Sequence, residues 1–290
     1  MSGCEAQAVF PKRQRQTSGY EARRVSGVVP REQSERIAAA AKAHGVTMNT
    51  LLQTAWGLLL HRYSGSRDVV FGGVVSGRPA DLPGVESMIG LFINTLPVRV
   101  ACEGQDTAAD VLRRMQADAL AAQAYGYYPL HEIQAHCTGT RELFDHILVF
   151  ENYPMPTSSE ASLDASGLAI TSVQADEQTN YDLNVMIQPG EELVVHFDYN
   201  GQVYEQEAME RVQGHWLQLV EQIVSQPNVP VTQLTGVRTG GYGAGAGSLA
   251  ATGGTDREPA ERAGHADGAA DGRAAGAAAD ALQRYGAGAP

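Results

Sequence analysis

Apolar and polar positions along the chain follow two different periods, which predicts a mixture of helices and strands. Between residues 30 and 63 the apolar side chains recur every three or four positions, a spacing typical of helices. We predict a first helix that begins at Pro30 and ends at Gly45, and a second over residues 48–63 with Thr47 as its N-cap. Because the second helix has almost no polar face, it should be the most buried helix of the fold.

Apolar runs without helical spacing predict the strands of a sheet. The expected strands are residues 68–75, 92–101, 144–150, 168–175, 183–187 and 193–199. Pro97 suggests an edge position for the second of these, and residues 188–191 form a turn that joins the last two as a hairpin. Further helices are expected after Thr107, over residues 130–136 and around Trp216. This order predicts an α/β fold (two-layer α+β) in which helices pack on a mixed sheet.

Three regions of the chain differ in their capacity to fold. Residues 1–27 show no sustained period and are predicted to be a disordered or severed leader. Residues 28–236 carry all of the periodic segments and are predicted to form one lobe. Residues 237–290 are mostly Ala and Gly with very few large apolar side chains, so they cannot offset their ordering entropy by burial. We expect this tail to be disordered.

Charge and cysteine content exclude several classes of partner. The 33 acidic residues outnumber the 21 basic ones, and a net charge of −12 repels nucleic acid and anionic membranes. No apolar run approaches the ~20 residues of a membrane span. Cys4, Cys102 and Cys137 show no paired spacing, so neither a disulfide framework nor a metal site is predicted. These features favour a cytoplasmic protein without a nucleic-acid or membrane partner.

The chain offers no recognisable motif for catalysis. It contains no Gly-x-Ser-x-Gly elbow, His-Glu-x-x-His helix, phosphate-binding loop or Gly-x-Gly-x-x-Gly turn. Of its eight histidines, no two are adjacent. His44, His61 and His215 lie on predicted helices whose faces already account for them, and His196 points away from the apolar face of its strand. We therefore assign no catalytic residue.

Two segments carry polar residues where a ligand would be recognised. In residues 72–99, glycines and prolines surround Arg78, Asn94 and Thr95, and such loops allow the backbone to approach a ligand closely. The alternative is a tight turn with Arg78 in a surface salt bridge and Asn94 in the sheet ladder. In the second segment, Glu151 and Asn152 follow a buried strand directly. These two residues either face a cleft or only mark the end of the strand.

These segments resemble condensation domains of nonribosomal peptide synthetases. The sequence Gly-Leu-Phe-Ile-Asn-Thr at residues 90–95 is similar to the family's Gly-x-Phe-(Val/Ile)-Asn-Thr motif. The resemblance extends over roughly residues 28–234. Its other matching phrases are residues 47–56, 63–65, 69–72, 76–79, 144–154 and 180–183.

The chain departs from the family pattern in two phrases. Where the family often has His-Gln-Asp-Tyr-Pro-Phe-Glu, residues 125–131 read Tyr-Gly-Tyr-Tyr-Pro-Leu-His, so that His131 replaces the usual acid. The family's Arg-Asp-x-Ser-Arg-Asn-Pro phrase is only echoed at residues 141–145. These differences leave the substrate preference open.

The resemblance implies a single chloramphenicol-acetyltransferase-like lobe, the C-terminal one of two. The family's His-His-x-x-x-Asp-Gly motif belongs to the first lobe and is absent here. The implied partners are a separate first lobe and peptidyl or aminoacyl carrier proteins, which supply the phosphopantetheine arm, while this chain binds no cofactor itself. The chain is expected to be inactive alone and to contribute one wall of the substrate channel. The channel residues are predicted to be Arg78, Asn94, Thr95, Glu151 and Asn152.

Two other interpretations stay open from the sequence. The same surface suits a non-catalytic module that docks carrier proteins. The chain is alternatively an inactive remnant, whose exposed apolar face would promote self-association.

Overall fold

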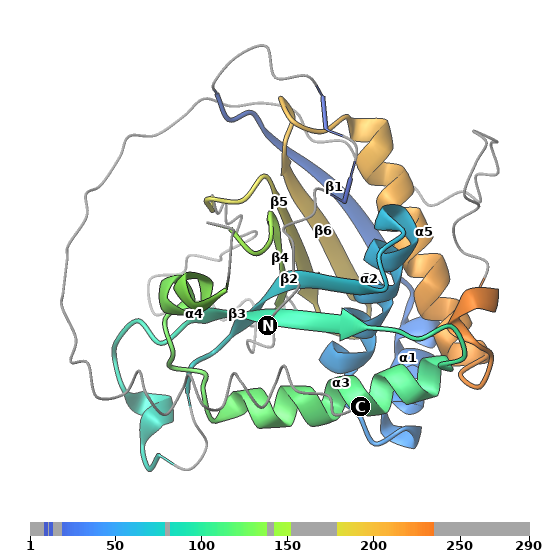
Figure 1. Cartoon of the computed structure of the whole chain (residues 1–290), viewed down its shortest axis with the longest axis horizontal. Coiled ribbons are helices and arrows are strands. Elements are labelled where there is room, and N and C mark those ends of the chain that lie inside the picture. Colours follow the sequence, from blue (N-terminus) through green and yellow to red (C-terminus); the bar gives the residue numbers. More distant parts are fainter. Residues whose placement is uncertain are drawn as a thin grey trace, which may run out of the picture.

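The computed structural model describes residues 9–10, 12–13, 19–78, 82–137, 142–151 and 179–234. In these residues, six strands form one sheet, and five α-helices and two short 3-10 helices accompany it (Figure 1). The strands are β1 (Ala22–Val29), β2 (Asp68–Val75), β3 (Asn94–Ala101), β4 (His146–Phe150), β5 (Leu183–Gln188) and β6 (Leu193–Asn200). The helices are α1 (Arg31–Ala43), α2 (Met48–Ser64), η1 (Val85–Ser87), α3 (Ala108–Gln123), α4 (Leu130–His136), α5 (Gln206–Ser225) and η2 (Val231–Gln233).

The sheet is mixed and has the strand order β1-β6-β5-β4-β2-β3, which confirms the predicted fold class. Strand β4 runs parallel to both of its neighbours, β2 and β5, and the other pairs are antiparallel. Strands β5 and β6 form the predicted hairpin. Pro97 lies in β3 at one edge of the sheet, as predicted, because an edge strand needs backbone donors on one side only.

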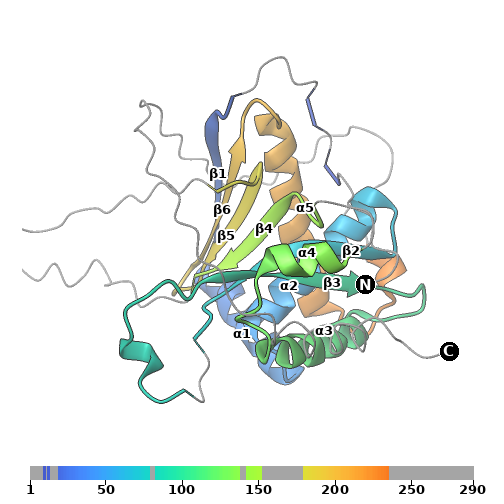
Figure 2. The same cartoon turned by 60° about the vertical axis from the view of Figure 1, so that its left-hand side comes forward.

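Helices cover the two faces of the sheet unequally. Helices α1, α2, α3 and α5 share one large core with the sheet, whereas α4 packs on the opposite face in a smaller cluster (Figures 1 and 2). Successive side chains of β4 point to opposite faces of the sheet. Leu148 belongs to the large core, and its neighbour Ile147 belongs to the smaller cluster with Ile133 of α4. None of the helices that the structure describes is long and apolar enough to cross a membrane.

Helix α2 lies at the centre of the large core, as its apolar pattern predicts. Eleven of its 17 residues are buried, more than in any other described helix. Thr47 is its N-cap, and its hydroxyl accepts a hydrogen bond from the backbone N–H of Thr50 at 3.0 Å. The helix ends at Gly65, whose φ of 70° is the left-handed conformation typical of such ends.

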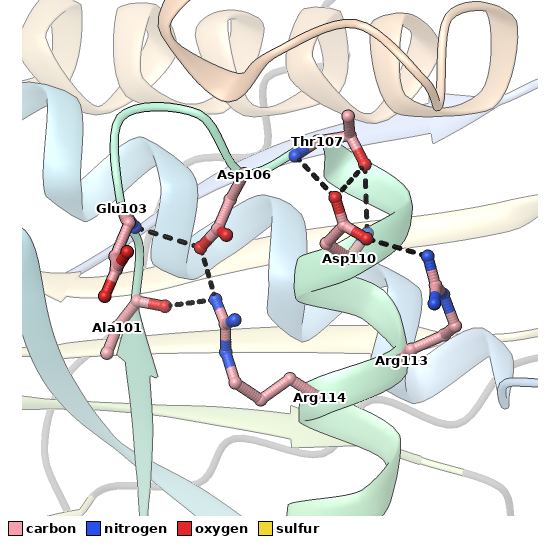
Figure 3. A network of polar contacts seen from close by, with 7 residues as sticks. All are labelled: Ala101, Glu103, Asp106, Thr107, Asp110, Arg113 and Arg114. Atoms are coloured by element: carbon pink, nitrogen blue, oxygen red, sulfur yellow. Dashed lines mark hydrogen bonds and ion pairs between the residues drawn. The ribbon is translucent and has the colours of Figure 1, made fainter. Parts of the chain in front are cut away.

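The start of α3 is fixed by a reciprocal cap, which Figure 3 shows together with its neighbours. Thr107 Oγ1 accepts a hydrogen bond from the N–H of Asp110, while Asp110 Oδ2 accepts one from the N–H of Thr107 at 3.0 Å. Arg114 ties the same helix to Asp106 at 2.7 Å and to the carbonyl of Ala101 at 2.6 Å. The helix expected after Thr107 is confirmed, and Arg114 anchors it to the end of β3.

The predicted leader is wrong for residues 22–27, because these residues form most of β1. Strand β1 pairs with β6 along its whole length and alternates buried and exposed positions. Its inward positions are Val25, Gly27 and Val29, and the glycine in the middle hides the apolar alternation in the sequence. A side chain at Gly27 would meet Gln213 Oε1 at 2.9 Å.

Other predicted boundaries agree with the described elements within two residues, with β3 and β4 each beginning two residues later than expected. The strand predicted over residues 168–175 lies outside the described residues. The same is true of residues 1–8 and of the predicted disordered tail.

Two helical glycines provide a matched test of the packing around α2. Alanine is intrinsically more favourable than glycine in a helix by about 1 kcal/mol. At Gly57, however, an added Cβ would lie 2.3 Å from Val100 Cγ2, whereas at Gly214 it would meet nothing within 4 Å. We expect Gly57→Ala to lower the free energy of unfolding by about 2 kcal/mol and Gly214→Ala to raise it by up to about 1 kcal/mol, measured by chemical denaturation. Stabilisation of both variants would contradict the close contact between α2 and β3.

Candidate functional site

Arg78 closes the long connection between β2 and β3. Its guanidinium donates hydrogen bonds to the carbonyl of Val85 and, at 3.0 Å, to the carbonyl of Met88. The same group lies over the ring of Phe92, 4.2 Å from its centroid. Within the described residues its partners are therefore two carbonyls and a ring, and not the carboxylate of the surface salt bridge that we considered. Arg78 therefore stabilises the conformation of the β2–β3 connection.

Gly77 allows the two ends of this connection to meet. Its φ is +63°, and a Cβ at this position would lie 1.7 Å from the carbonyl oxygen of Phe92. No other residue type fits such an approach. The glycine-rich character of the segment is thus explained by the geometry of the connection, which brings Arg78 beside the start of β3.

Asn94 joins the start of β3 to the connection between α3 and α4. Its Nδ2 donates to the carbonyls of Gly126 at 2.9 Å and Tyr128 at 2.8 Å, and its Oδ1 accepts from the N–H of Thr95 at 2.9 Å. The backbone of Asn94 lies in the ladder opposite Val75, as the alternative interpretation proposed, but its side chain has this separate role. Thr95, the next residue, is half-buried in β3. The carboxamide therefore positions the turn that departs from the family pattern.

The β2–β3 connection exposes many apolar side chains. It projects away from the body of the lobe in both views (Figures 1 and 2). Ile89 and Leu91 are almost fully exposed, at 104% and 93%. We call the exposed apolar residues of this connection the loop patch: Leu82, Met88, Ile89, Leu91 and Ile93. Large apolar side chains that are exposed within one short segment favour a surface that binds a partner.

Glu151 lies at the same end of the strands as Arg78, just beyond the last residue of β4. Strands β2 and β4 are parallel, and the pairing of Gly73 with Leu148 puts the end of β4 level with the residues that lead into Arg78. Glu151 Oε2 accepts a hydrogen bond from Gln188 Nε2 at 2.7 Å. The structure thus places four of the predicted channel residues, Arg78, Asn94, Thr95 and Glu151, at one end of the strands. Asn152, the fifth, lies outside the described residues.

His146 is a buried imidazole that the sequence analysis did not single out, with 1% of its surface exposed. Its Nε2 accepts a hydrogen bond from Trp56 Nε1 at 3.0 Å, and since an indole N–H only donates, Nε2 carries no proton. The proton is on Nδ1 and is donated to Asp145 Oδ1 at 2.8 Å. Both nitrogens are held by partners within the lobe. His146 is therefore not free to accept a proton from a substrate.

Other described histidines also have local partners. His215 Nδ1 lies 2.7 Å from the hydroxyl of Tyr63, and His196 Nδ1 lies 2.8 Å from that of Ser26. Burial lowers the pKa of both imidazoles, and a nearby arginine, Arg24 for His196 and Arg211 for His215, lowers it further. Within the described residues no hydrogen bond joins two imidazoles, and no group of three His, Cys, Asp or Glu side chains could hold a metal ion. The hydrogen-bonding nitrogens of His146, His196 and His215 are thus engaged by neighbouring side chains.

Comparison with known sequences identifies the family of this chain. The family described as "Condensation domain" matches residues 1–241. The chain is 47% identical over 220 residues to a subunit of mycosubtilin synthase from Bacillus subtilis, and 38% identical over 238 residues to tyrocidine synthase 3 from Brevibacillus parabrevis. These alignments cover 76% and 81% of this chain but only 8% and 4% of those proteins. The chain thus spans less than a tenth of the length of either relative.

Solved structures show the same fold. A four-domain nonribosomal peptide synthetase, bound to AMP and glycine, gives a TM-score of 0.67 at 14% identity over 82% of this chain and 19% of that one. The X-domain from teicoplanin biosynthesis gives 0.65 at 20% identity, covering 80% of this chain and 54% of that chain. For the first condensation domain of the calcium-dependent antibiotic synthetase, in complex with a substrate analogue, the TM-score is 0.59 at 20% identity, with 74% and 46% coverage. At such identities the likeness establishes the fold alone.

Asn94→Asp tests the link between β3 and the α3–α4 connection. The substitution keeps the shape of the side chain but replaces an amide that donates to two carbonyls with a carboxylate that repels them. We expect a loss of about 2 kcal/mol in the free energy of unfolding and faster hydrogen exchange over residues 125–129. Leu91→Ala, at an exposed position of the β2–β3 connection, is the control and should change neither. An unaltered exchange rate in Asn94→Asp would refute the positioning role.

A second prediction concerns the pH dependence of stability. Burial alone would raise the pKa of Asp145, but the hydrogen bond from His146 and the ammonium group of Lys12 outweigh it and lower the pKa from 3.8 to about 2. The ionised carboxylate therefore stabilises the fold above about pH 4, and this contribution, about 2 kcal/mol, is lost as the pH falls towards 2.

Denaturation of Asp145→Asn at several pH values measures this contribution. The variant should be less stable at pH 7 and should lose less stability between pH 4 and pH 2 than the unmodified chain. Glu192→Gln, at an exposed carboxyl on the β5–β6 turn, is the matched control. Identical pH profiles for Asp145→Asn and the unmodified chain would contradict the assignment.

Proposed function

The chain belongs to the condensation-domain family, and on that premise we propose that it supplies the second of the two lobes of such a domain in a nonribosomal peptide synthetase. The coverage of solved relatives supports this proposal: the chain corresponds to 46% of one condensation domain and 54% of the X-domain. A first lobe, with its His-His-x-x-x-Asp-Gly motif, would complete the domain. The observation that carries the proposal comes from the described residues: a six-stranded sheet with a large buried core has a β2–β3 connection that exposes the loop patch.

The proposed reaction is amide formation between two carrier-bound substrates. The amine of the acceptor attacks the thioester carbonyl of the donor, a C–N bond forms, and the C–S bond to the phosphopantetheine thiol of the donor carrier breaks. The proton of the amine passes to a base, which the first lobe would provide. In this scheme the present chain helps to bind and orient the substrates. Holding the reacting groups close together lowers the activation barrier of amide formation.

Within this scheme the predicted channel residues shape one wall. Arg78 holds the β2–β3 connection through the carbonyls of Val85 and Met88, and Asn94 holds the turn before α4. Glu151 is the charged group at the end of β4. The loop patch would pack against the first lobe, so that its apolar side chains leave water when the domain is complete.

Reconstitution with a first lobe tests the proposal. The 290-residue chain is mixed with carrier proteins loaded with donor and acceptor amino acids, with or without the first lobe of a related condensation domain, and the dipeptide on the acceptor carrier is measured by mass spectrometry. We expect product only when both lobes are present. Product from this chain alone would overturn the proposal. Carrier binding without product, even with the first lobe, would instead indicate a docking module.

A matched pair of variants tests the loop patch in the same assay. Leu91→Asp places a charge at a position predicted to lie in the interface between the lobes, and should reduce product formation at least tenfold. Val28→Asp places the same charge at an exposed apolar position of β1 and should leave it unchanged. Equal effects of the two substitutions would exclude a specific role of the patch.

A further inference from the structure

Phe10 lies in an aromatic pocket between α2 and the start of β4. It is only 3% exposed, although it belongs to the segment predicted as a leader. Its ring centroid lies 5.7 Å from that of Trp56, 5.3 Å from that of Tyr63 and 5.9 Å from that of His146. Val9, the residue before it, is also buried. An aromatic side chain ahead of β1 is thus part of the large core.

Lys12 continues this attachment with a charge. Its Nζ lies 2.7 Å from Asp145 Oδ2 and 3.9 Å from Asp182 Oδ2, and it also lies over the ring of Tyr204 at 5.8 Å from the centroid. The ammonium group is therefore placed between two carboxylates and the face of an aromatic ring, three groups that each favour a cation.

Arg13 fixes the backbone of the same segment to the turn that follows β6. The backbone N–H of Arg13 donates a hydrogen bond to the carbonyl of Val203 at 2.8 Å, and its guanidinium donates one to the carbonyl of Gly201 at 3.1 Å. An ion pair with Glu205 at 3.3 Å completes the contact. Side chain, backbone and charge all attach this segment to the lobe within five residues.

Asp145 connects the attached segment to the interior. Its Oδ1 accepts a hydrogen bond from Nδ1 of His146, which is itself hydrogen-bonded to Trp56. Its Oδ2 forms an ion pair with Lys12. Removal of Lys12 would leave a largely buried carboxylate with half of its partners. Asp145 precedes β4, whereas Glu151 follows it, so the attachment lies at the opposite end of this strand from the candidate site.

We propose that Val9, Phe10, Lys12 and Arg13 form a clasp that fastens the polypeptide ahead of β1 to this corner of the lobe, with Asp145 as the acceptor that holds it. The clasp fixes the position at which any preceding polypeptide enters the lobe, far from the loop patch. It limits the freedom of that connection and so raises the effective concentration of whatever is attached to it. The proposal holds whether or not the chain acts as half of a condensation domain.

Hydrogen exchange of the Arg13 amide in the full 290-residue chain tests the clasp. We expect this amide to exchange at least tenfold more slowly than in a synthetic peptide of residues 7–18, because it donates to Val203. Phe10→Ala should abolish this protection, and Lys12→Met, which keeps the apolar stem but removes the charge, should reduce it severalfold. Phe92→Ala removes a ring at the other end of the lobe and should leave it unchanged.

Amides of α2 and α5 show whether a variant has unfolded as a whole. If Phe10→Ala lowers their protection as well, Lys12→Met decides, because it alters no buried apolar contact of the ring. Loss of protection at Arg13 with intact helices in either variant supports the clasp. Exchange of Arg13 in the unmodified chain at the rate of the free peptide would overturn it, as would full protection in both variants.

Discussion

Burial of α2 between the sheet and α5 is the interaction on which the rest of the described structure depends. Trp56, at the middle of this helix, is fully buried and lies 5.7 Å from the ring of Phe197 in β6 and 6.2 Å from that of Trp216 in α5. Its indole N–H also needs a buried acceptor, and His146 at the start of β4 provides it. One side chain thereby fixes two helices, α2 and α5, and two strands, β4 and β6, in relation to one another.

The length of β4 sets the distance between its two ends. Asp145 precedes this strand, which begins at His146, the acceptor of the Trp56 indole, and ends at Phe150, directly before Glu151. Five strand residues span about 17 Å. The parallel strand β2 carries the chain in the same direction and delivers Arg78 and the exposed β2–β3 connection to the far end. The structure thus separates the buried His146 at one end of β4 from an opposite end where the β2–β3 connection exposes apolar side chains.

Periodicity in the sequence was sufficient for most elements, because α2, α5 and the β5–β6 hairpin each carry a complete local pattern. It was not sufficient for β1, where Gly27 occupies an inward position, or for Phe10, whose partners lie about 45 to 135 residues away along the chain. The candidate site shows the same division. Its motif indicated Arg78 and Asn94, but the carbonyls that they hold depend on how distant segments pack, and the contribution of His146 was hidden in an apolar strand.

In the function that we propose, the β2–β3 connection packs against a first lobe of the condensation domain. Hydrogen exchange of residues 82–93 in the 290-residue chain, with and without a first lobe of this family, tests this contact directly. The account predicts that these amides become protected by at least tenfold when the first lobe is added, while those of α2 remain as they are. Binding of the first lobe without protection of residues 82–93, or no binding at all, would contradict it.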